Sequence, residues 1–349
     1  MNVALAGDIA LNGLISSDSG TSSMRYGWLA GELGKLAGVI ANLETPVVSA
    51  ERNEGRSAWL FADPAVTLDV LKRLNIICVS LANNHILDCG REGLANTVRL
   101  LDEAGIHHAG AGLTPEQAGP ALFQTGGRKV AFAAWVHPST HPAADRYGDI
   151  FLNIFDVPEA SAQIRSLREE ADIVIVSIHW GTDYSFWHEE WQSETARQLI
   201  DAGADIIMGH HSHTLQAYER YGHGLIFYGL GSLTFGDFVR NGRQYALFRK
   251  TKKTAVFVLG KTGEIKGTIS TREKKGNFIV RGRMNVKARN RRLTAINRLR
   301  QRSRLARHLL RFQENVLYRI YEYFFGYYMN PAARLVQFGN LRKIKRLLR

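Results

Sequence analysis

A short stretch in the second half of the chain ends in three closely spaced histidines, His210, His211 and His213. The apolar residues 206–208 and Gly209, which precede them, are typical of a buried strand that stops at a tight turn. Neutral imidazole is the commonest nitrogen ligand for zinc, manganese and iron. Taken alone, this stretch fits a metal site and a histidine-rich surface loop equally well.

Four other apolar runs also end in polar groups of the kind that bind metals. These groups are Asp8, Glu44, Asn84 with the adjacent His85, and His179. The crevice beyond the carboxyl ends of parallel strands is where open α/β sheets bind their ligands. Carboxylate, amide and imidazole donors at five strand ends therefore favour a metal site over a surface loop. This mixture of donors predicts one or two divalent ions of manganese, zinc or iron.

The elements that must position these groups alternate between strands and helices. Helical patterns at 64–74, 92–104 and 191–202 separate the short β-branched runs. Four later strands, at 225–228, 245–249, 254–259 and 264–270, follow one another without helices between them. We therefore predict an α/β fold in which a largely parallel sheet is extended by antiparallel strands.

Charge divides the chain of 349 residues into two parts. Residues 271–349 hold 22 Lys or Arg against 3 Asp or Glu, whereas residues 1–270 hold 23 against 29. We predict an acidic body over 1–270 and a basic tail over 271–349. The two cysteines, Cys78 and Cys89, form no disulfide framework, which suits a reducing compartment. Residues 1–6 lack the pattern of a signal peptide, and no apolar run approaches membrane-spanning length, so we expect a cytoplasmic protein.

The tail has the pattern of basic amphipathic helices. Apolar residues recur at steps of three and four over 293–324, with arginines on the opposite face, and residues 335–348 repeat this design. Such helices suit an anionic membrane surface, so residues 285–349 are predicted to hold the protein at the inner face of a membrane. An anionic polymer and docking onto the acidic body are alternatives. Nucleic acid is the least favoured partner, because the tail holds no recognisable nucleic-acid motif.

Six motifs carry a resemblance to a known family. They are Gly7-Asp8-Ile9, Asn42-Leu43-Glu44, the string from Ser80 to His85 with Asp88, His179-Trp180-Gly181, Gly209-His210-His211-Ser212-His213 and Tyr228-Gly229-Leu230-Gly231-Ser232. In this order they resemble the CapA family, which is associated with capsule or poly-γ-glutamate biosynthesis and belongs with the calcineurin-like metallophosphoesterases. The resemblance covers about residues 1–270. It implies a layered α/β/β/α sandwich, to which the basic helical tail is appended.

The resemblance also implies a role for each motif residue. Asp8 and His213 would hold a first metal, Glu44 would bridge two metals, and Asn84 with His179 would hold the second. His210 and His211 compete for the remaining imidazole position, and the motif spacing favours His211. His85 would act as general acid or stabilise charge. Further residues are expected beside the ligands or the substrate: Asn42, Asp88, Trp180, Asp183 and Asp237.

Two positions depart from the superfamily pattern. Ala10 stands where its first motif, Asp-x-His, has an imidazole, and Glu44 stands where phosphoesterases use Asp. A site with one metal therefore stays open beside a site with two. We predict a metal-dependent hydrolase that acts on a phosphoester or on an amide of an anionic polymer. The alternative is a non-catalytic polymer-binding or assembly component with a vestigial metal site.

Overall fold

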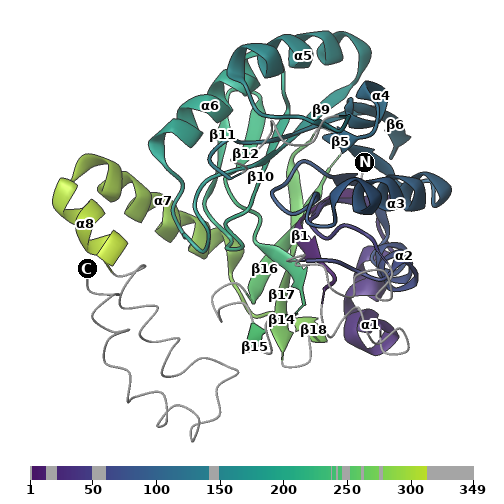
Figure 1. Cartoon of the computed structure of the whole chain (residues 1–349). Helices are drawn as coiled ribbons and strands as arrows, with labels where there is room; N and C mark the ends of the chain where they lie inside the picture. Colours follow the sequence, from purple (N-terminus) through teal and green to yellow (C-terminus); the bar gives the residue numbers. More distant parts are fainter. Residues whose placement is uncertain are drawn as a thin grey trace, which may run out of the picture.

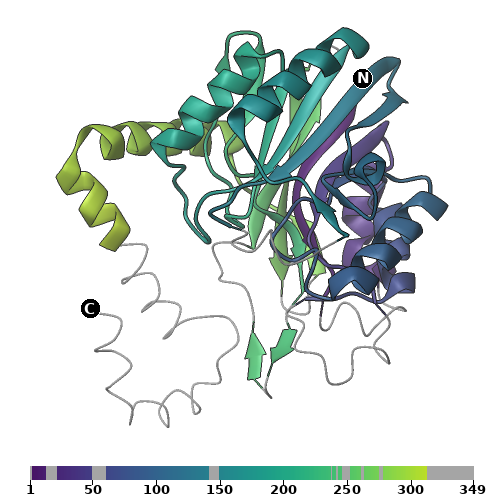
Figure 2. The same ribbon diagram turned by 45° about the horizontal axis from the view of Figure 1, so that its top comes forward.

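Two β-sheets pack face to face and carry helices on both outer sides (Figures 1 and 2). The computed structural model describes residues 2–12, 22–48, 60–140, 149–236, 238–240, 243–245, 252–260, 263–274 and 278–312. The predicted layered α/β/β/α sandwich is confirmed. The strand pattern alone suggested one main sheet, but the structure divides these strands between two sheets.

The first sheet contains the N-terminal parallel strands and the late antiparallel ones, in the order β18-β17-β16-β1-β2-β3-β4, with β13 paired to β1. Its strands are β1 (Val3–Ala10), β2 (Gly38–Leu43), β3 (Ile76–Ser80), β4 (His107–Ala109), β13 (Ser232–Phe235), β16 (Lys253–Leu259), β17 (Ile265–Lys274) and β18 (Phe278–Arg281). β1 runs parallel to β2 and β13, and antiparallel to β16. The predicted boundary between residues 270 and 271 falls within β17, and the division into two domains stays a prediction.

The second sheet has the order β11-β12-β10-β9-β7-β6. Its strands are β6 (Ala121–Thr125), β7 (Arg128–Val136), β9 (Ile173–His179), β10 (Ile206–His210), β11 (Tyr218–Tyr221) and β12 (Gly224–Phe227). Two short pairs lie apart from both sheets: β5 (Ala111–Gly112) with β8 (Phe151–Leu152), and β14 (Phe238–Arg240) with β15 (Arg243–Tyr245).

Apolar side chains fill the space between the layers. The core between the sheets includes Leu5, Phe132 and Phe227, all 0–1% exposed. Helices α1 (Ser22–Leu33), α2 (Pro64–Arg73) and α3 (Gly90–Glu103) cover the outer face of the first sheet, and α5 (Val157–Glu170) and α6 (Glu190–Asp201) cover that of the second. The short helix α4 (Pro115–Ala118) follows β5. Strands such as β1 and β9 are buried along their whole length, which explains their near-continuous apolar sequences.

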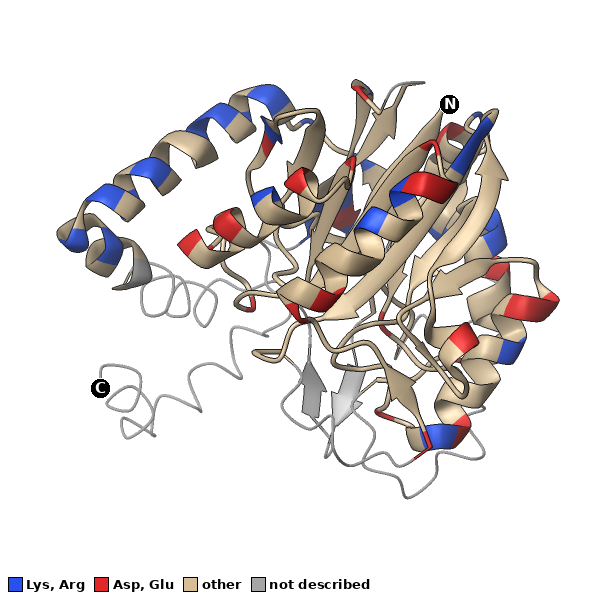
Figure 3. Cartoon of the chain, turned by 90° about the horizontal axis from the view of Figure 1, so that it is seen from above, with Lys and Arg blue, Asp and Glu red and all other residues tan. Residues whose placement is uncertain are grey.

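The beginning of the basic tail docks onto the body as helix α7 (Val286–Arg302). The Asn290 side chain pairs with both backbone groups of Tyr218 in the edge strand β11, at 2.7 and 2.9 Å. Further along, the Arg300 guanidinium forms two hydrogen bonds with the Glu189 carboxylate. The docking alternative therefore describes α7. Its exposed positions include Lys287, Arg291, Arg292, Arg298 and Arg302, and Figure 3 shows basic residues along the helix.

The predicted single apolar stripe from residue 293 onward is interrupted. A break at Ser303 separates α7 from α8 (Arg304–Phe312), because the Ser303 hydroxyl accepts a hydrogen bond from the Ala306 N–H and begins a new helix. Leu293 is buried against the body, whereas Leu305 and Leu309 of α8 are exposed. The second predicted segment, 335–348, lies outside the described residues. None of the described helices is both long enough and apolar enough to cross a membrane.

Candidate metal centre

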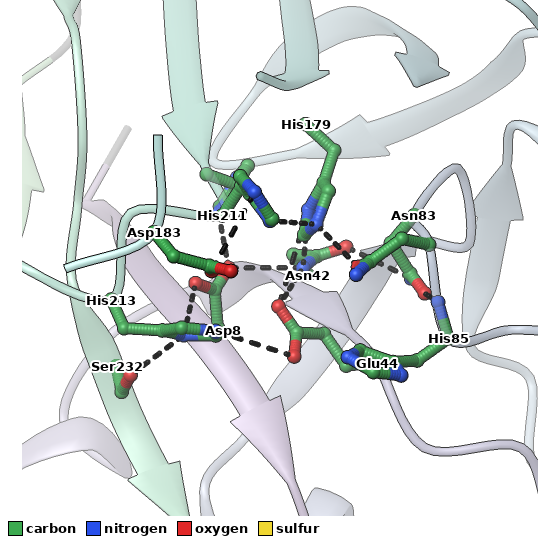
Figure 4. Close-up of polar contacts among 12 residues, drawn as sticks. Asp8, Asn42, Glu44, Asn83, His85, His179, Asp183, His211, His213 and Ser232 are labelled. Atoms are coloured by element: carbon green, nitrogen blue, oxygen red, sulfur yellow. Dashed lines mark hydrogen bonds and ion pairs between the residues drawn. The ribbon is translucent and has the colours of Figure 1, made fainter. Parts of the chain in front are cut away.

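The polar ends of five strands from both sheets meet at one edge of the sandwich (Figure 4). Asp8 lies near the end of β1, Glu44 directly follows β2, and His179 and His210 are the last residues of β9 and β10. Asp8, Glu44 and His179 each offer a ligand atom within 4.8 Å of the others, and all three are buried. The common edge predicted from the sequence therefore exists, and it is shared by two sheets.

Glycines just before two of these residues let the backbones approach closely. A Cβ atom on Gly7 would lie 1.8 Å from the Gly231 carbonyl oxygen, and one on Gly209 would lie 2.1 Å from that of Tyr228. The Asp8 N–H donates to the same Gly231 oxygen at 2.8 Å. A side chain at either position would require the backbone between β12 and β13 to move.

Asp8 is the centre of the hydrogen-bond network. Its Oδ1 accepts from His210 Nδ1 at 2.8 Å and from Asn42 Nδ2 at 2.9 Å, while His213 Nδ1 lies 3.2 Å from Oδ2. Burial alone would raise the pKa of Asp8, but the interactions with His210 and His213 outweigh it and hold the pKa well below its ordinary value. Asp8 is therefore ionised, and His210 donates its Nδ1 proton to it.

Three buried polar atoms of the centre lack a hydrogen-bond partner among the described residues. They are Asp8 Oδ2, Glu44 Oε2 and His210 Nε2. Buried polar atoms are normally paired. The two carboxylate oxygens have only ion-pair contacts with His213, at 3.2 and 4.0 Å, so a metal ion can take the place of the His213 proton in this cluster. Burial and the nearby Asp8 charge raise the pKa of Glu44 to about 8, against the lowering effect of His213. A bound cation would keep both carboxylates ionised.

The imidazoles of the centre are mostly held neutral. His179 Nε2 lies 2.8 Å from Asn84 Oδ1 and 3.1 Å from His211 Nδ1. Burial, with the nearby His211, lowers the pKa of His179 well below its ordinary value, and burial lowers that of His211 to about 4. Neutral imidazoles with available lone pairs are what a metal requires.

His213 is the exception. Burial would lower its pKa, but Glu44 and Asp8 raise it to about 9 in the absence of an ion. Its Nδ1 lies 3.1 Å from the Ser232 hydroxyl, and its Nε2 lies 4.0 Å from Glu44 Oε2. His213 therefore occupies the place of a cation between the two carboxylates.

The turn that carries the three histidines is strained. His211 and His213 both have positive φ angles, 80° and 53°. Such angles are uncommon outside glycine and cost about 1–3 kcal/mol each. This backbone conformation turns both imidazoles toward the centre, as Figure 4 shows.

His85 and Asp88 form a pair at the rim of the centre. His85 Nδ1 lies 2.9 Å from Asp88 Oδ2, which also accepts from the Leu60 N–H at 2.9 Å. Burial would lower the pKa of His85, but Asp88 outweighs it and the net shift is upward. The His85 side chain is still 22% exposed. It can therefore carry a proton and reach a bound molecule.

Asn83 and Ser232 belong to the centre but were missing from the predicted site residues. Asn83 Nδ2 donates to Asn42 Oδ1 at 3.2 Å, and Asn42 in turn donates to Asp8. Asn83 Oδ1 accepts from the backbone N–H of His85 at 3.1 Å, which fixes the turn that presents this histidine. Both residues stand inside the six motifs given above. For Asn83, the available signal was the pair of adjacent asparagines, Asn83 and Asn84, at the end of a strand.

Two residues predicted to lie beside the metal ligands, Asp183 and Trp180, have different positions in the structure. Asp183 reaches the centre, with its Oδ1 3.5 Å from His211 Nε2. Trp180 does not: its ring is fully buried in the core beneath α5 and α6, and its Nε1 donates to the Tyr228 carbonyl oxygen. Alternation along β9 points Trp180 away from the face that presents His179. Asp237 lies outside the described residues.

The donor set fits a divalent metal ion. It combines two carboxylates, an amide oxygen and several imidazoles, of which His179 and His211 are held neutral, and this is the ligand chemistry of manganese, zinc and iron. Ala10 supplies no ligand, since it packs against Leu60 and Phe235 in a small apolar cluster. The structure thus defines a sandwich protein with a carboxylate–histidine centre at the shared edge of its sheets.

Comparison with known proteins places this sandwich in a family. The family model of the bacterial capsule synthesis protein PGA_cap matches residues 2–237, and the chain belongs to this family. The matched range contains all the residues of the centre.

Two relatives illustrate the similarity. The capsule biosynthesis protein CapA of Bacillus anthracis is 29% identical over 205 residues, which are 56% of this chain and 50% of that protein. The PGA biosynthesis protein CapA of Bacillus subtilis (strain 168) is 31% identical over 183 residues, or 52% and 48% of the two chains. The chain spans about half the length of the curated relatives it matches.

Solved structures are matched at lower similarity. The 5′-nucleotidase precursor from Thermus thermophilus gives a TM-score of 0.43 at 13% identity, covering 77% of this chain and 53% of that one.

Proposed function

We propose that this chain is a metal-dependent hydrolase of capsule or poly-γ-glutamate biosynthesis, which cleaves a phosphoester or an amide in an anionic polymer. The observation that carries the proposal is the cluster of buried polar atoms without a hydrogen bond, Asp8 Oδ2, Glu44 Oε2 and His210 Nε2, beside the ligand-type group of Asp8, Glu44 and His179. These atoms come from separate strands, and without a metal ion the proton on His213 is what offsets the buried carboxylate charge; a divalent ion would supply more positive charge at the same place.

One or two divalent ions would be held by the strand-end residues. These are Asp8, Glu44, Asn84, His179, His210, His211 and His213. When bound, such an ion lowers the pKa of a coordinated water and polarises the oxygen of the scissile group. Asn42 and Asn83 orient Asp8 through hydrogen bonds, so the chain itself fixes the direction of this carboxylate.

His85 is the proposed general acid. Its Nδ1 is hydrogen-bonded to Asp88, so the proton on Nε2 is the one available to the leaving oxygen or nitrogen. The raised pKa keeps this proton on the ring closer to neutral pH, and Asp88 stabilises the charged ring until the proton is transferred. Asp88 acts through His85 and is a positioning residue.

The second candidate is a non-catalytic component that binds the polymer. Ala10 favours this candidate, because an alanine packed in an apolar cluster stands where the superfamily pattern has a metal-binding histidine. Such a protein would keep the strand-end residues and bind an ion, but it would not turn over a substrate.

The basic helices suggest where the protein works. We propose that α7 and α8 hold it against an anionic membrane surface on the cytoplasmic side. The large apolar side chains of Leu299, Leu305, Leu309 and Phe312 are 48–69% exposed and lie on helices rich in arginine. Exposed leucines and a phenylalanine among basic residues are typical of interfacial helices.

Turnover measurements separate the two candidates. Metal-loaded wild-type protein is assayed with bis(p-nitrophenyl) phosphate and with an oligo-γ-glutamate, beside the variants His85→Ala and His223→Ala. We expect the exposed His223 to be dispensable and His85→Ala to lower kcat by about 100-fold or more with its metal content unchanged. Absence of turnover by metal-loaded wild-type protein on both substrates would favour the binding component.

A further inference from the structure

A basic pocket lies on the first sheet, apart from the metal centre. It has a volume of about 640 Å³ and forms where β16, β17 and β18 meet the start of α7 (Figure 1). Six of its described lining residues are cationic, and none is acidic. The cationic residues are Lys253, Arg272, Lys274, Arg281, Arg283 and Arg289.

The placement of these charges is unfavourable without a ligand. Lys253 stands directly opposite Arg272 in the ladder between β16 and β17, and Lys274 follows two residues along on the same face. Directly opposed side chains have Cβ atoms about 5 Å apart, and like charges in this arrangement destabilise a sheet. Within the described residues, no carboxylate forms an ion pair with any of the six cations.

One wall of the pocket is held rigidly. Arg289 donates from Nη2 to the Leu215 carbonyl oxygen at 3.1 Å, and its guanidinium lies 5.2 Å from the centroid of the Phe186 ring. Its Nε is buried and has no partner among the described residues. Burial lowers the pKa of Arg289, and the charge of Arg292 lowers it further. An anion in the pocket would give Nε a hydrogen-bond acceptor and would offset the lowering of the Arg289 pKa.

The turn between β18 and α7 preforms the floor. The Gly282 N–H donates to the Ser270 carbonyl oxygen at 2.8 Å, and the Met284 N–H donates to the Ser270 hydroxyl at 3.3 Å. A Cβ atom on Gly282 would lie only 2.4 Å from that hydroxyl. The turn is therefore packed tightly against β17 and leaves the pocket open beside it.

The pocket opens at the same end of the first sheet as the metal centre. β16 runs antiparallel to β1, with Leu5 opposite Phe257, so the start of β16 lies near the carboxyl end of β1. β13 pairs with β1 at Asp8 and also contacts β16. With strands about 4.8 Å apart, β17 lies roughly 15 Å from Asp8. An extended α-peptide of about five residues covers that distance, and a γ-linked chain, whose units are longer, needs fewer.

We propose that this pocket binds a run of carboxylates on an anionic polymer, the neighbouring part of which lies at the metal centre. The link to the metal centre rests on the proposed function, whereas binding in the pocket does not. The cations are spread over three strands and a helix, which suits regularly spaced charges better than one compact anion. No aromatic residue is among the described lining, so stacking of nucleic-acid bases has no support. The concave shape does not match a flat membrane.

Binding of a labelled oligo-γ-glutamate of ten residues to the full chain, followed by fluorescence anisotropy, tests the proposal. The pocket variant is Lys253→Glu with Arg272→Glu. The control is Arg99→Glu with Arg165→Glu, which makes the same change in net charge at exposed positions of α3 and α5. We expect at least 10-fold weaker binding for the pocket variant and less than a 2-fold change for the control.

Three outcomes would overturn the proposal. Equal losses in both variants would mean that net charge alone attracts the peptide, and no loss in either would place binding elsewhere on the chain. Displacement of the peptide by tripolyphosphate at lower concentrations than by unlabelled oligo-γ-glutamate would replace the carboxylate assignment with a phosphate one. When the pocket substitutions are added to the double variant Glu44→Ala, His213→Ala, they are expected to weaken peptide binding by the same factor of at least 10, because binding in the pocket does not depend on the metal centre. Failure of the metal centre and failure of the pocket are therefore distinguishable.

Discussion

Replacing Asn83 with Ala removes a fully buried amide that connects the metal centre to its supporting turn. Asn83 Nδ2 donates to Asn42 Oδ1 at 3.2 Å and to the Leu43 carbonyl oxygen at 2.8 Å. Its Oδ1 accepts from the N–H groups of His85 and Ile86 at 3.1 and 2.9 Å. The variant therefore loses four hydrogen bonds and leaves several buried groups without a partner.

The expected effect follows from these bonds. At about 1 kcal/mol net for each bond, the free energy of unfolding should fall by about 3–4 kcal/mol. Loss of support for Asn42, which orients Asp8, should also weaken metal affinity by about 10–100-fold. Urea unfolding of the metal-free protein measures the first quantity, and titration with Mn²⁺ or Zn²⁺ measures the second.

Asn153→Ala is the matched control. Asn153 Nδ2 donates to two carbonyl oxygens, those of Ala118 at 2.8 Å and Ala134 at 3.2 Å, and takes no part in the metal centre. This variant should lose about 2 kcal/mol and keep its metal affinity. The reasoning is refuted if Asn83→Ala binds metal as tightly as the control, because the amide chain would then play no part in holding Asp8.

Two further predictions concern the fold. Gly7→Ala should unfold the protein or cost several kcal/mol, because the added Cβ would meet the Gly231 carbonyl oxygen. Gly27→Ala in α1, where the added Cβ has open space, should be neutral or stabilise the protein by up to about 1 kcal/mol. Thermal unfolding of the two variants compares these effects. Burial, with the charge of Arg300, lowers the pKa of His188 to about 3, so the unfolded chain binds the extra proton and stability falls as pH drops below about 6.5. Between pH 7 and 5 the wild type should therefore lose about 2 kcal/mol more than His188→Gln in urea unfolding, and equal losses would contradict this assignment.

The sequence allowed much of the centre to be predicted, because strand ends can be recognised locally. Asp8, His179 and His210 each end an apolar run, and parallel strands bring such ends together. Local patterns do not show which strands pair, so the division into two sheets came only from the resemblance. Trp180 could have been assigned correctly from the alternation of side chains along a strand. The role of Asn83 could not, because it depends on Asn42, which is 41 residues away.

The tail shows a second limit of sequence reasoning. Apolar residues recur at steps of three and four on both sides of Ser303, so the pattern predicted one continuous apolar stripe on one helix. In the structure Arg300 is buried against Glu189, and the chain then turns into α8. Which apolar residues face the body and which stay exposed is decided by these tertiary contacts, and periodicity carries no information about them.

Metal content tests the central claim most directly. Elemental mass spectrometry of the purified full chain is compared with the same measurement on the double variant Glu44→Ala, His213→Ala and on the control Asn153→Ala. The metal centre described here predicts one to two equivalents of manganese, zinc or iron in the wild type and in the control, and loss of the metal in the double variant. A wild-type protein that binds no metal, even after reconstitution with each of the three ions, would contradict it.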